Sequence, residues 1–274
     1  MLSINFHQTF IPERRYIAAL LQYAALGGSG SITDLAEQTG IPMGKSSGKA
    51  TAMLCYAEGM GLIEQAGSGR EISPELTPFG RIVYTEDKFM GEEIVQWLAH
   101  MNLCSRHIGA QAWRAVFAEG RNILGIRFST DELETYLVGR FGPVGKSRTR
   151  TGPLLGTYLE DAALARASVL VKDGHTFVRR KAPLIDNYRF AYSAYLLSLL
   201  ERHFPGENQV TVTDFSRETL WFDMCLWNQG DVEHLLATIE QTGLIAVDRQ
   251  MQPWIIEKRA DAEQVWPLIF SELS

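Results

Sequence analysis

Apolar residues recur every three or four positions along most of the chain, which is the spacing of an amphipathic helix. Between residues 14 and 26, for example, the apolar positions are Ile17, Leu20, Leu21, Ala24 and Ala25. Short runs with strand character are few and lie near glycine-containing turns. This pattern predicts a mainly helical α+β fold with small β wings.

The first 87 residues are predicted to form a winged helix-turn-helix domain. A short helix, a turn at Gly40 and a longer helix follow one another as in a helix-turn-helix, and Thr33 is the expected cap of the short helix. A hairpin and a further helix complete the order typical of a winged helix. The expected elements are helices over residues 14–26, 33–39 and 45–60, strands over 61–63 and 71–76, and a helix from residue 77.

Residues 88–181 are predicted to form a helical middle. Ser129 is the expected cap of a helix that runs through Phe141. Asp173-Gly174 is typical of the tip of a hairpin, here over residues 169–178. The middle is therefore expected to be helices with a single hairpin.

Residues 182–274 are predicted to form a second winged-helix-like unit. A strongly apolar helix ends at Pro205-Gly206, and a later helix over residues 231–242 precedes a second wing. Gly243-Leu244-Ile245 mirrors Gly61-Leu62-Ile63, which indicates a structural repeat. Two winged units flanking a helical middle are thus expected.

The start of the third helix carries the first candidate DNA contacts. The segment from Gly44 to Lys49 places two lysines and two hydroxyls where free backbone N–H groups and the helix dipole favour an anion. In a helix-turn-helix, residues at this point reach bases or phosphates. The candidates are Lys45, Ser46, Ser47 and Lys49. A solvated helix start that binds nothing is the alternative, because such domains also mediate protein contacts.

Three further basic positions or clusters are candidate phosphate contacts. Arg70 lies at the expected tip of the first hairpin, and the glycine-containing stretch over residues 140–150 holds four positive charges and no acid. A third cluster follows the second hairpin. A shared nucleic-acid track is one interpretation and solvated connectors are the other. The residues concerned are Arg70, Lys146, Arg148, Arg150, Arg179, Arg180 and Lys181.

Two segments resemble a phosphate-binding loop but do not satisfy its pattern. Gly40 to Ser46 has three residues between its glycines where the P-loop has four, and it follows a helix instead of a buried strand. Gly142 to Ser147 departs from the pattern in a similar way. Nucleotide hydrolysis is therefore excluded as an interpretation of either segment.

The chain offers few residues suited to a metal. His100, Cys104 and His107 share one helix face if the helix extends that far, but no fourth ligand is visible. A buried thiol beside hydrogen-bonded histidines is the preferred interpretation. The candidate carboxylates for Mg²⁺ are Asp131, Glu132, Glu134, Glu160 and Asp161, which helix caps and solvated faces explain better.

Charge is distributed unevenly along the chain, whose net charge is −6. Residues 1–181 hold 20 Lys and Arg against 18 Asp and Glu, whereas residues 182–274 hold 6 against 14. A polyanion should therefore meet the first two thirds more readily. The acidic and aromatic last third is expected to serve dimerisation or partner docking.

No segment approaches 18 uncharged apolar residues, and the start lacks a secretory pattern. Three widely separated cysteines do not make a disulfide framework and fit a reducing cytoplasm. A cytoplasmic protein that is not embedded in a membrane is therefore expected.

Three motifs together resemble a known bacterial and archaeal family. They are Phe6-His7-Gln8-Thr9-Phe10-Ile11-Pro12, the segment from Gly44 to Lys49, and Gly59-Met60-Gly61-Leu62-Ile63. The family, first described as a domain of unknown function, is the SspB-like family of single-stranded DNA phosphorothioation systems. The resemblance is strongest over residues 4–65. It implies a DNA-binding, strand-specific nickase that prepares DNA for sulfur insertion.

The resemblance also implies partners and a cofactor. The partners are DNA, an ATPase and a sulfotransfer protein resembling phosphoadenosine phosphosulfate reductase, and nicking implies Mg²⁺ or Mn²⁺. No catalytic signature of the family maps onto this chain, so no catalytic residue is assigned. A non-enzymatic transcriptional regulator and an assembly adaptor remain the alternatives, and a palindromic operator bound by a dimer would favour the regulator.

Overall fold

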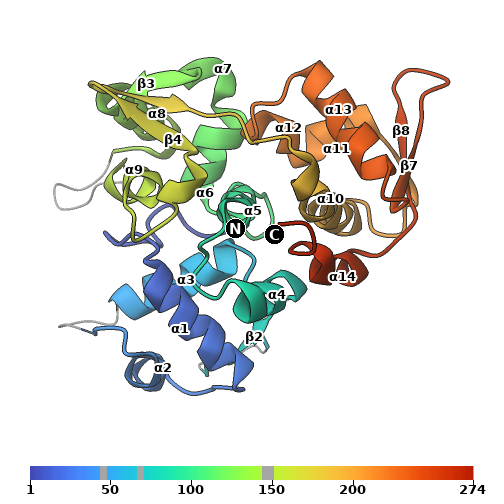
Figure 1. Ribbon diagram of the computed structural model, residues 1–274. Coiled ribbons are helices and arrows are strands. Elements are labelled where there is room, and N and C mark those ends of the chain that lie inside the picture. Colours follow the sequence, from blue (N-terminus) through green and yellow to red (C-terminus); the bar gives the residue numbers. More distant parts are fainter. Residues whose placement is uncertain (44–47, 67–70, 144–150, 274) are drawn as a thin grey trace. The chain divides into compact units, whose positions relative to one another are not determined.

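The computed structural model describes residues 1–43, 48–66, 71–143 and 151–273. The chain divides into two compact units, Met1–Arg180 and Lys181–Ser274. Helices dominate the described residues, and the strands form three small antiparallel sheets (Figure 1). The expected mainly helical α+β class is confirmed. The division expected between residues 87 and 88 falls within the first unit, where it remains a prediction.

The first part of unit 1 contains four helices and a hairpin. Their order is α1 (Arg14–Ala25), α2 (Ile32–Thr39), α3 (Gly48–Gly59), β1 (Ile63–Gln65), β2 (Pro74–Leu76) and α4 (Pro78–Glu86). Ile17, Leu20 and Leu21 of α1 are fully buried, as the helical spacing predicts. Gly40 ends α2 in the left-handed conformation with φ 68°, also as predicted.

The cap of α2 differs from the prediction. Ser31, and not Thr33, is the N-cap residue, and it forms a capping box with Asp34. The Asp34 side chain accepts hydrogen bonds from the backbone nitrogen and the hydroxyl of Ser31, each at 2.7 Å. The acidic residue three positions on completes this box and makes Ser31 the better cap.

The rest of unit 1 contains more β-structure than the sequence pattern predicts. Besides the expected hairpin, a third strand, β3, pairs with its second strand, so the sheet order is β3-β5-β4. The elements are α5 (Glu93–Leu103), α6 (Gln111–Trp113), the π-helix η1 (Arg114–Glu119), α7 (Arg121–Leu124), β3 (Arg127–Ser129), α8 (Thr130–Phe141), α9 (Thr151–Leu159), the 3-10 turn η2 (Ala165–Ala167), β4 (Leu170–Asp173) and β5 (Thr176–Arg179).

Unit 2 packs its helices around a core of aromatic side chains. Trp221 and Tyr195 are fully buried, and their ring centroids lie 5.4 Å apart. The sheet order is β6-β8-β7. The elements are η3 (Asp186–Tyr188), α10 (Arg189–His203), β6 (Gln209–Thr211), α11 (Val212–Thr219), α12 (Trp221–Met224), α13 (Gln229–Glu240), β7 (Ile245–Asp248), β8 (Ile255–Lys258), α14 (Ala262–Val265) and η4 (Trp266–Leu268).

The capping boxes of α2 and α8 should make the stability of unit 1 depend on pH. Hydrogen bonds from Ser31 lower the pKa of Asp34, and those from Ser129 lower the pKa of Glu132. A carboxylate whose pKa is lower in the folded state stabilises the fold above its unfolded pKa of about 4, and this stabilisation is lost as pH falls. We expect the urea midpoint to fall between pH 5 and pH 3, and to fall less in Asp34→Asn/Glu132→Gln.

The control for this experiment replaces two exposed acids of the same helices that form no cap, Glu37→Gln and Glu134→Gln. This pair removes the same charge but should leave the fall in urea midpoint as large as in the parent chain. An equal reduction in both pairs would mean that net charge, and not capping, sets the acid sensitivity.

Candidate nucleic-acid interface

The described part of the predicted recognition helix, α3, has little free surface. None of the residues Gly48–Gly59 is exposed, and Ala52, Met53 and Tyr56 are completely buried. A helix that enters a major groove must present one face to the bases. Because only Lys49, Thr51, Cys55 and Glu58 are half-exposed, α3 offers little surface for bases in a major groove. Lys45, Ser46 and Ser47 lie outside the described residues.

Lys49 is held by its own protein. Its ammonium lies 2.5 Å from a carboxylate oxygen of Glu13 and 4.6 Å from the ring centroid of Tyr16. Partial burial acts to raise the pKa of Glu13, but hydrogen bonds from Lys49 and Arg15 outweigh it, so this pKa is lowered. A phosphate at Lys49 must therefore compete with a committed carboxylate, which makes Lys49 the weaker of the two lysines proposed here.

The three residues of the cluster after the second hairpin have different surroundings. Arg179 is 3% exposed and donates hydrogen bonds to the carbonyl oxygens of Phe117, at 2.6 Å, and Val116, at 3.5 Å. Lys181 forms an ion pair with Asp231 at 2.9 Å. Arg180 is exposed. Arg179 is enclosed in the core, so we leave it out of the proposed contact set and keep Arg180 as the best described candidate.

Arg70, Lys146, Arg148 and Arg150 lie outside the described residues. Around Arg70, the flanking strands are acidic, since Glu64 of β1 lies directly opposite Glu75 of β2. Both glutamates are exposed, as is Glu71. The described part of this hairpin therefore repels phosphate, and any attraction there depends on Arg70 alone.

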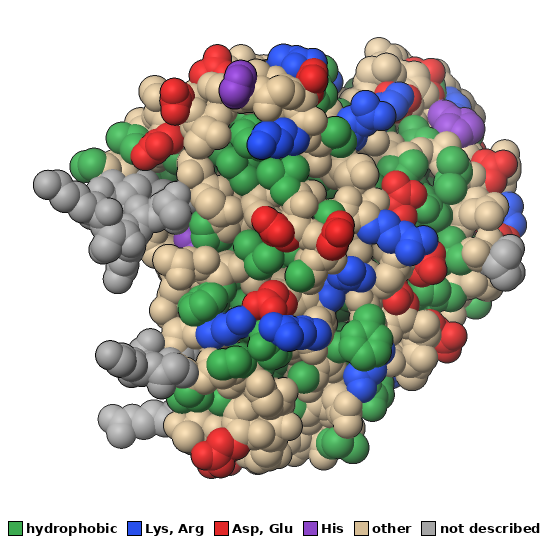
Figure 2. All heavy atoms as spheres, turned by 60° about the vertical axis from the view of Figure 1, so that its left-hand side comes forward, with side chains coloured by type: hydrophobic (Ala, Val, Ile, Leu, Met, Phe, Trp, Pro, Cys, Tyr) green, Lys and Arg blue, Asp and Glu red, His purple; other side chains and the backbone are tan. Residues whose placement is uncertain are grey.

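Charged side chains of both signs are interspersed on the face drawn in Figure 2. Lys and Arg side chains there stand beside Asp and Glu, and hydrophobic and polar atoms separate them. Several cations of unit 1 form ion pairs, among them Arg15 with Glu13 and Arg127 with Asp173. Within the described residues, this face carries no continuous basic patch.

His100, Cys104 and Tyr158 form a buried polar cluster, and not a metal site. His100 Nδ1 lies 2.6 Å from the Tyr158 hydroxyl, and the Cys104 thiol lies 3.8 Å from the same nitrogen. Burial raises the pKa of Cys104, so the thiol stays protonated and is a poor metal ligand. α5 ends at Leu103, and His107 is exposed beyond it.

The candidate carboxylates also stay apart. Across the described parts of the chain, no three His, Cys, Asp or Glu side chains are grouped so as to hold a metal ion. Glu132 is occupied as the capping residue of α8, accepting from the Ser129 backbone nitrogen at 2.7 Å. Asp131, Glu134, Glu160 and Asp161 are exposed.

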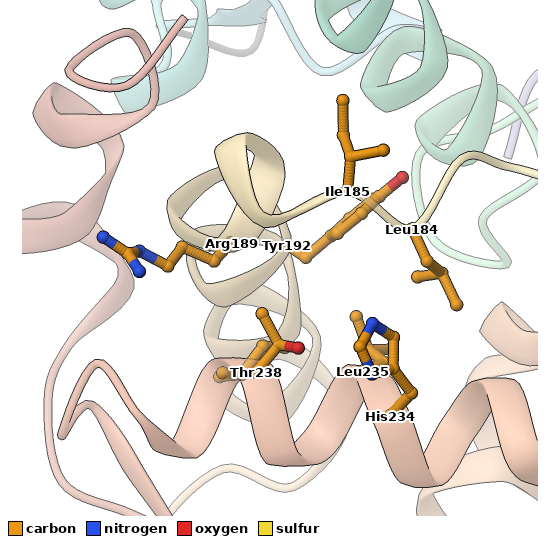
Figure 3. Close-up of a pocket in the computed structure, with 8 residues that line it drawn as sticks. Leu184, Ile185, Arg189, Tyr192, His234, Leu235 and Thr238 are labelled. Carbon is orange, nitrogen blue, oxygen red and sulfur yellow. The ribbon is translucent and has the colours of Figure 1, made fainter.

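An apolar pocket between α10 and α13 is too small for a substrate. Arg189 and Tyr192 of α10, His234 and Thr238 of α13, and the preceding Leu184 and Ile185 surround it (Figure 3). Its volume of about 10 Å³ is near the lower limit for one water molecule. This pocket therefore reflects imperfect packing of two helices.

Comparison with known proteins gives the fold. No family model and no curated protein matches the chain. Two solved structures match it over its whole length: the magnesium ion-bound crystal structure of SspB, with a TM-score of 0.74, and the crystal structure of SspB, with a TM-score of 0.69. Each has 14% sequence identity, and each match covers 100% of this chain and 88% of the SspB chain.

The chain has the fold of SspB. The likeness spans both compact units, which agrees with the resemblance carried by residues 4–65 and extends it to the whole chain. At 14% identity, the match establishes an SspB-like architecture and assigns no site residue. Within the described residues, none of the helices combines the length and hydropathy needed to cross a membrane.

Proposed function

We propose that this SspB-like chain is the DNA-binding component of a DNA phosphorothioation system, and that it nicks one DNA strand before sulfur insertion. The observation that carries the proposal is the match to SspB over the whole chain at a TM-score of 0.74. Its proposed partners are DNA, an ATPase and a sulfotransfer protein.

The charge distribution supports contact with DNA through unit 1. This unit holds 19 Lys and Arg against 18 Asp and Glu, whereas unit 2 holds 7 against 14. Because α3 offers little exposed surface, the contacts proposed are with phosphates and not with bases in the major groove. Lys45, Ser46, Ser47, Arg70, Lys146, Arg148, Arg150 and Arg180 are the proposed contacts, with Lys49 and Lys181 as contacts that must first leave an acidic partner.

One of the two matching SspB structures is magnesium ion-bound, and whether this chain holds such an ion is a separate question. The described carboxylates do not gather into a site for it. We therefore assign no metal ligand and no catalytic step to any described residue. Nicking with Mg²⁺ or Mn²⁺ is proposed as an activity of the chain, to be located by experiment.

Nicking is tested on supercoiled plasmid with Mg²⁺, Mn²⁺ or EDTA. We expect open circles with a divalent cation and none with EDTA. Each nick should create one new 5′ end and one new 3′ end, on one strand only. Denaturing sequencing gels of end-labelled duplex locate the cut strand. A matched preparation carrying Lys45→Ala/Arg180→Ala should nick more slowly, because it binds DNA less tightly. Supercoils that stay intact while DNA is bound would contradict nicking by the isolated chain.

A DNA-bound adaptor without catalytic activity is the second candidate. The observation that favours it is the lack of a metal-binding group among the described residues. It predicts salt-sensitive DNA binding with no cation-dependent cleavage, and recruitment of the ATPase or sulfotransfer partner to DNA. Gel shifts with each purified partner, run beside the plasmid assay, separate the two functions.

A further inference from the structure

Two of the three small sheets share one layout, and the surroundings of the third resemble it. In each of two sheets, the strand that precedes a helix pairs with the last strand of the following hairpin, giving the orders β3-β5-β4 and β6-β8-β7. In the first part of unit 1, Gly30 takes the place of that preceding strand through an antiparallel bridge to Ile72, next to β2. Two sheets thus place their first strand beside their third, and in the first part of unit 1 the single residue Gly30 takes the corresponding position.

The helices that follow these first strands begin in the same way. Each has a Ser or Thr N-cap, an acidic residue three positions on, and then a fully buried apolar residue. The three sets are Ser31, Asp34 and Leu35; Ser129, Glu132 and Leu133; and Thr211, Asp214 and Phe215. The side chain of each N-cap accepts a hydrogen bond from the backbone nitrogen of its acidic residue.

This shared layout makes α3, α9 and α13 equivalent, since each is the helix between the capped helix and the hairpin, with the short α12 preceding α13 in unit 2. In a winged helix, the start of this third helix and the neighbouring hairpin form the face that meets DNA. We propose that the chain holds three copies of one winged-helix topology, and that this face of the third copy binds a basic, apolar segment of a partner protein.

The third copy carries acid where a DNA-contacting helix carries base. The first turns of α13 hold two acids, Asp231 and Glu233, and the helix contains no lysine or arginine. Asp231 is paired with Lys181, but Glu233 accepts only from the Gln229 amide, at 2.9 Å, and forms no ion pair with a described cation. An uncompensated carboxylate at this point disfavours phosphate and favours a cationic side chain.

Glu233 lines a groove together with apolar and polar side chains. It is lined by residues from the start of α11, from α13 and from the end of the hairpin connection: Val212, Thr213, Gln229, Val232, Glu233, Gln252, Pro253 and Trp254. Its volume is about 150 Å³, the share of about five water molecules, which is room for one aliphatic side chain. Met251, in the same connection, is 79% exposed. A lining that combines apolar side chains with the carboxylate of Glu233 fits a segment that carries both aliphatic and basic residues.

Unit 2 as a whole favours such a segment over an acidic one. It holds 14 acidic against 7 basic residues, so a partner with the opposite charge is attracted and another copy of the same acidic face is repelled. The occupant proposed is therefore a segment of another protein, and not DNA or this face of a second copy.

The test uses three fluorescein-labelled octapeptides and the full-length chain. One alternates Leu and Lys, one alternates Ser and Lys, and one alternates Leu and Glu. By fluorescence anisotropy, we expect the Leu–Lys peptide to bind at least tenfold more tightly than either other peptide. Glu233→Lys and Trp254→Ala should each weaken that binding at least tenfold. Glu263→Lys makes the same charge change at an exposed residue of α14, outside the groove, and should weaken it less than twofold.

Three results would overturn the proposal. The first is that the Ser–Lys peptide binds as tightly as the Leu–Lys peptide, which would mean that the groove has no role. The second is that Glu263→Lys weakens binding as much as Glu233→Lys, which would mean that the total charge of unit 2 alone attracts the peptide. In sedimentation, a dimer dissociated by Glu233→Lys would assign the face to a second copy. Folding of each variant is checked by its circular dichroism spectrum and melting temperature. None of these measurements involves DNA. The peptide-binding result therefore stands even if the chain proves not to bind or nick DNA.

Discussion

Arg179→Ala should lower the free energy of unfolding by about 3–5 kcal/mol, whereas Arg180→Ala should change it by less than about 0.5 kcal/mol. Arg179 lies in the core against the π-helix η1, and its guanidinium carbon is 5.4 Å from the ring centroid of Phe117. Val116 and Phe117 lie near the C-terminal end of η1, where helix carbonyls lack an intrahelical donor and need another one. Without Arg179, the carbonyls of Val116 and Phe117 lose theirs, and a cavity remains.

Urea unfolding of the two variants measures the difference in stability. DNA binding by the same two variants tests whether Arg180, and not Arg179, contacts a phosphate. Arg180→Ala should reduce the slope of log affinity against log salt by about 1, the expected effect of one lost phosphate contact. If instead Arg179→Ala left stability unchanged but weakened DNA binding, the guanidinium would be free in solution and the buried arrangement would be wrong.

The triple variant Lys146→Ala/Arg148→Ala/Arg150→Ala should weaken duplex DNA binding on the order of 100-fold at 0.1 M salt. Each phosphate contact releases about 0.9 of a counterion, so losing three contacts reduces the salt slope by about 2.7. The effect should be the same for unrelated sequences, because phosphate contacts carry no base information. Salt-titrated gel shifts on two duplexes of different sequence measure both quantities.

The matched control removes three other exposed positive charges of unit 1, in Arg15→Ala/Arg81→Ala/Arg166→Ala. Its net charge equals that of the test variant, so a general loss of attraction should affect both alike. We expect less than a fivefold loss of affinity in the control. Equal losses in the two variants would mean that DNA senses the total charge of unit 1 and not the segment over residues 146–150.

The internal repeat was only partly visible in the sequence. The likeness of Gly61-Leu62-Ile63 to Gly243-Leu244-Ile245 indicates two copies, whereas we propose three, of which two have a three-stranded sheet of the same strand order. The middle copy is hard to detect because β3 is three residues long and pairs with a strand about fifty residues later. A signal was nevertheless present: Ser or Thr, an acid three positions on and a large apolar residue next recur at Ser31, Ser129 and Thr211.

The position of Arg179 could have been predicted from strand alternation. Side chains alternate between the two faces of a strand, so Arg179 shares its face with Phe177, and both are buried. Of the two adjacent arginines, only Arg180 is exposed, so only Arg180 can contact a ligand. Reading the cluster as three equal charges overlooked this period of two.

Local sequence by itself determined which segments become helices, where several of them begin and end, and the mainly helical class. Those features depend on apolar spacing, caps and glycines within a few residues of one another. Tertiary structure alone decided that α3 has no fully exposed residue among Gly48–Gly59, that Lys49 pairs with Glu13 and that Arg179 faces η1. These outcomes depend on residues tens of positions apart, so the surroundings of a charge, and hence its availability to DNA, are fixed only when the chain has packed.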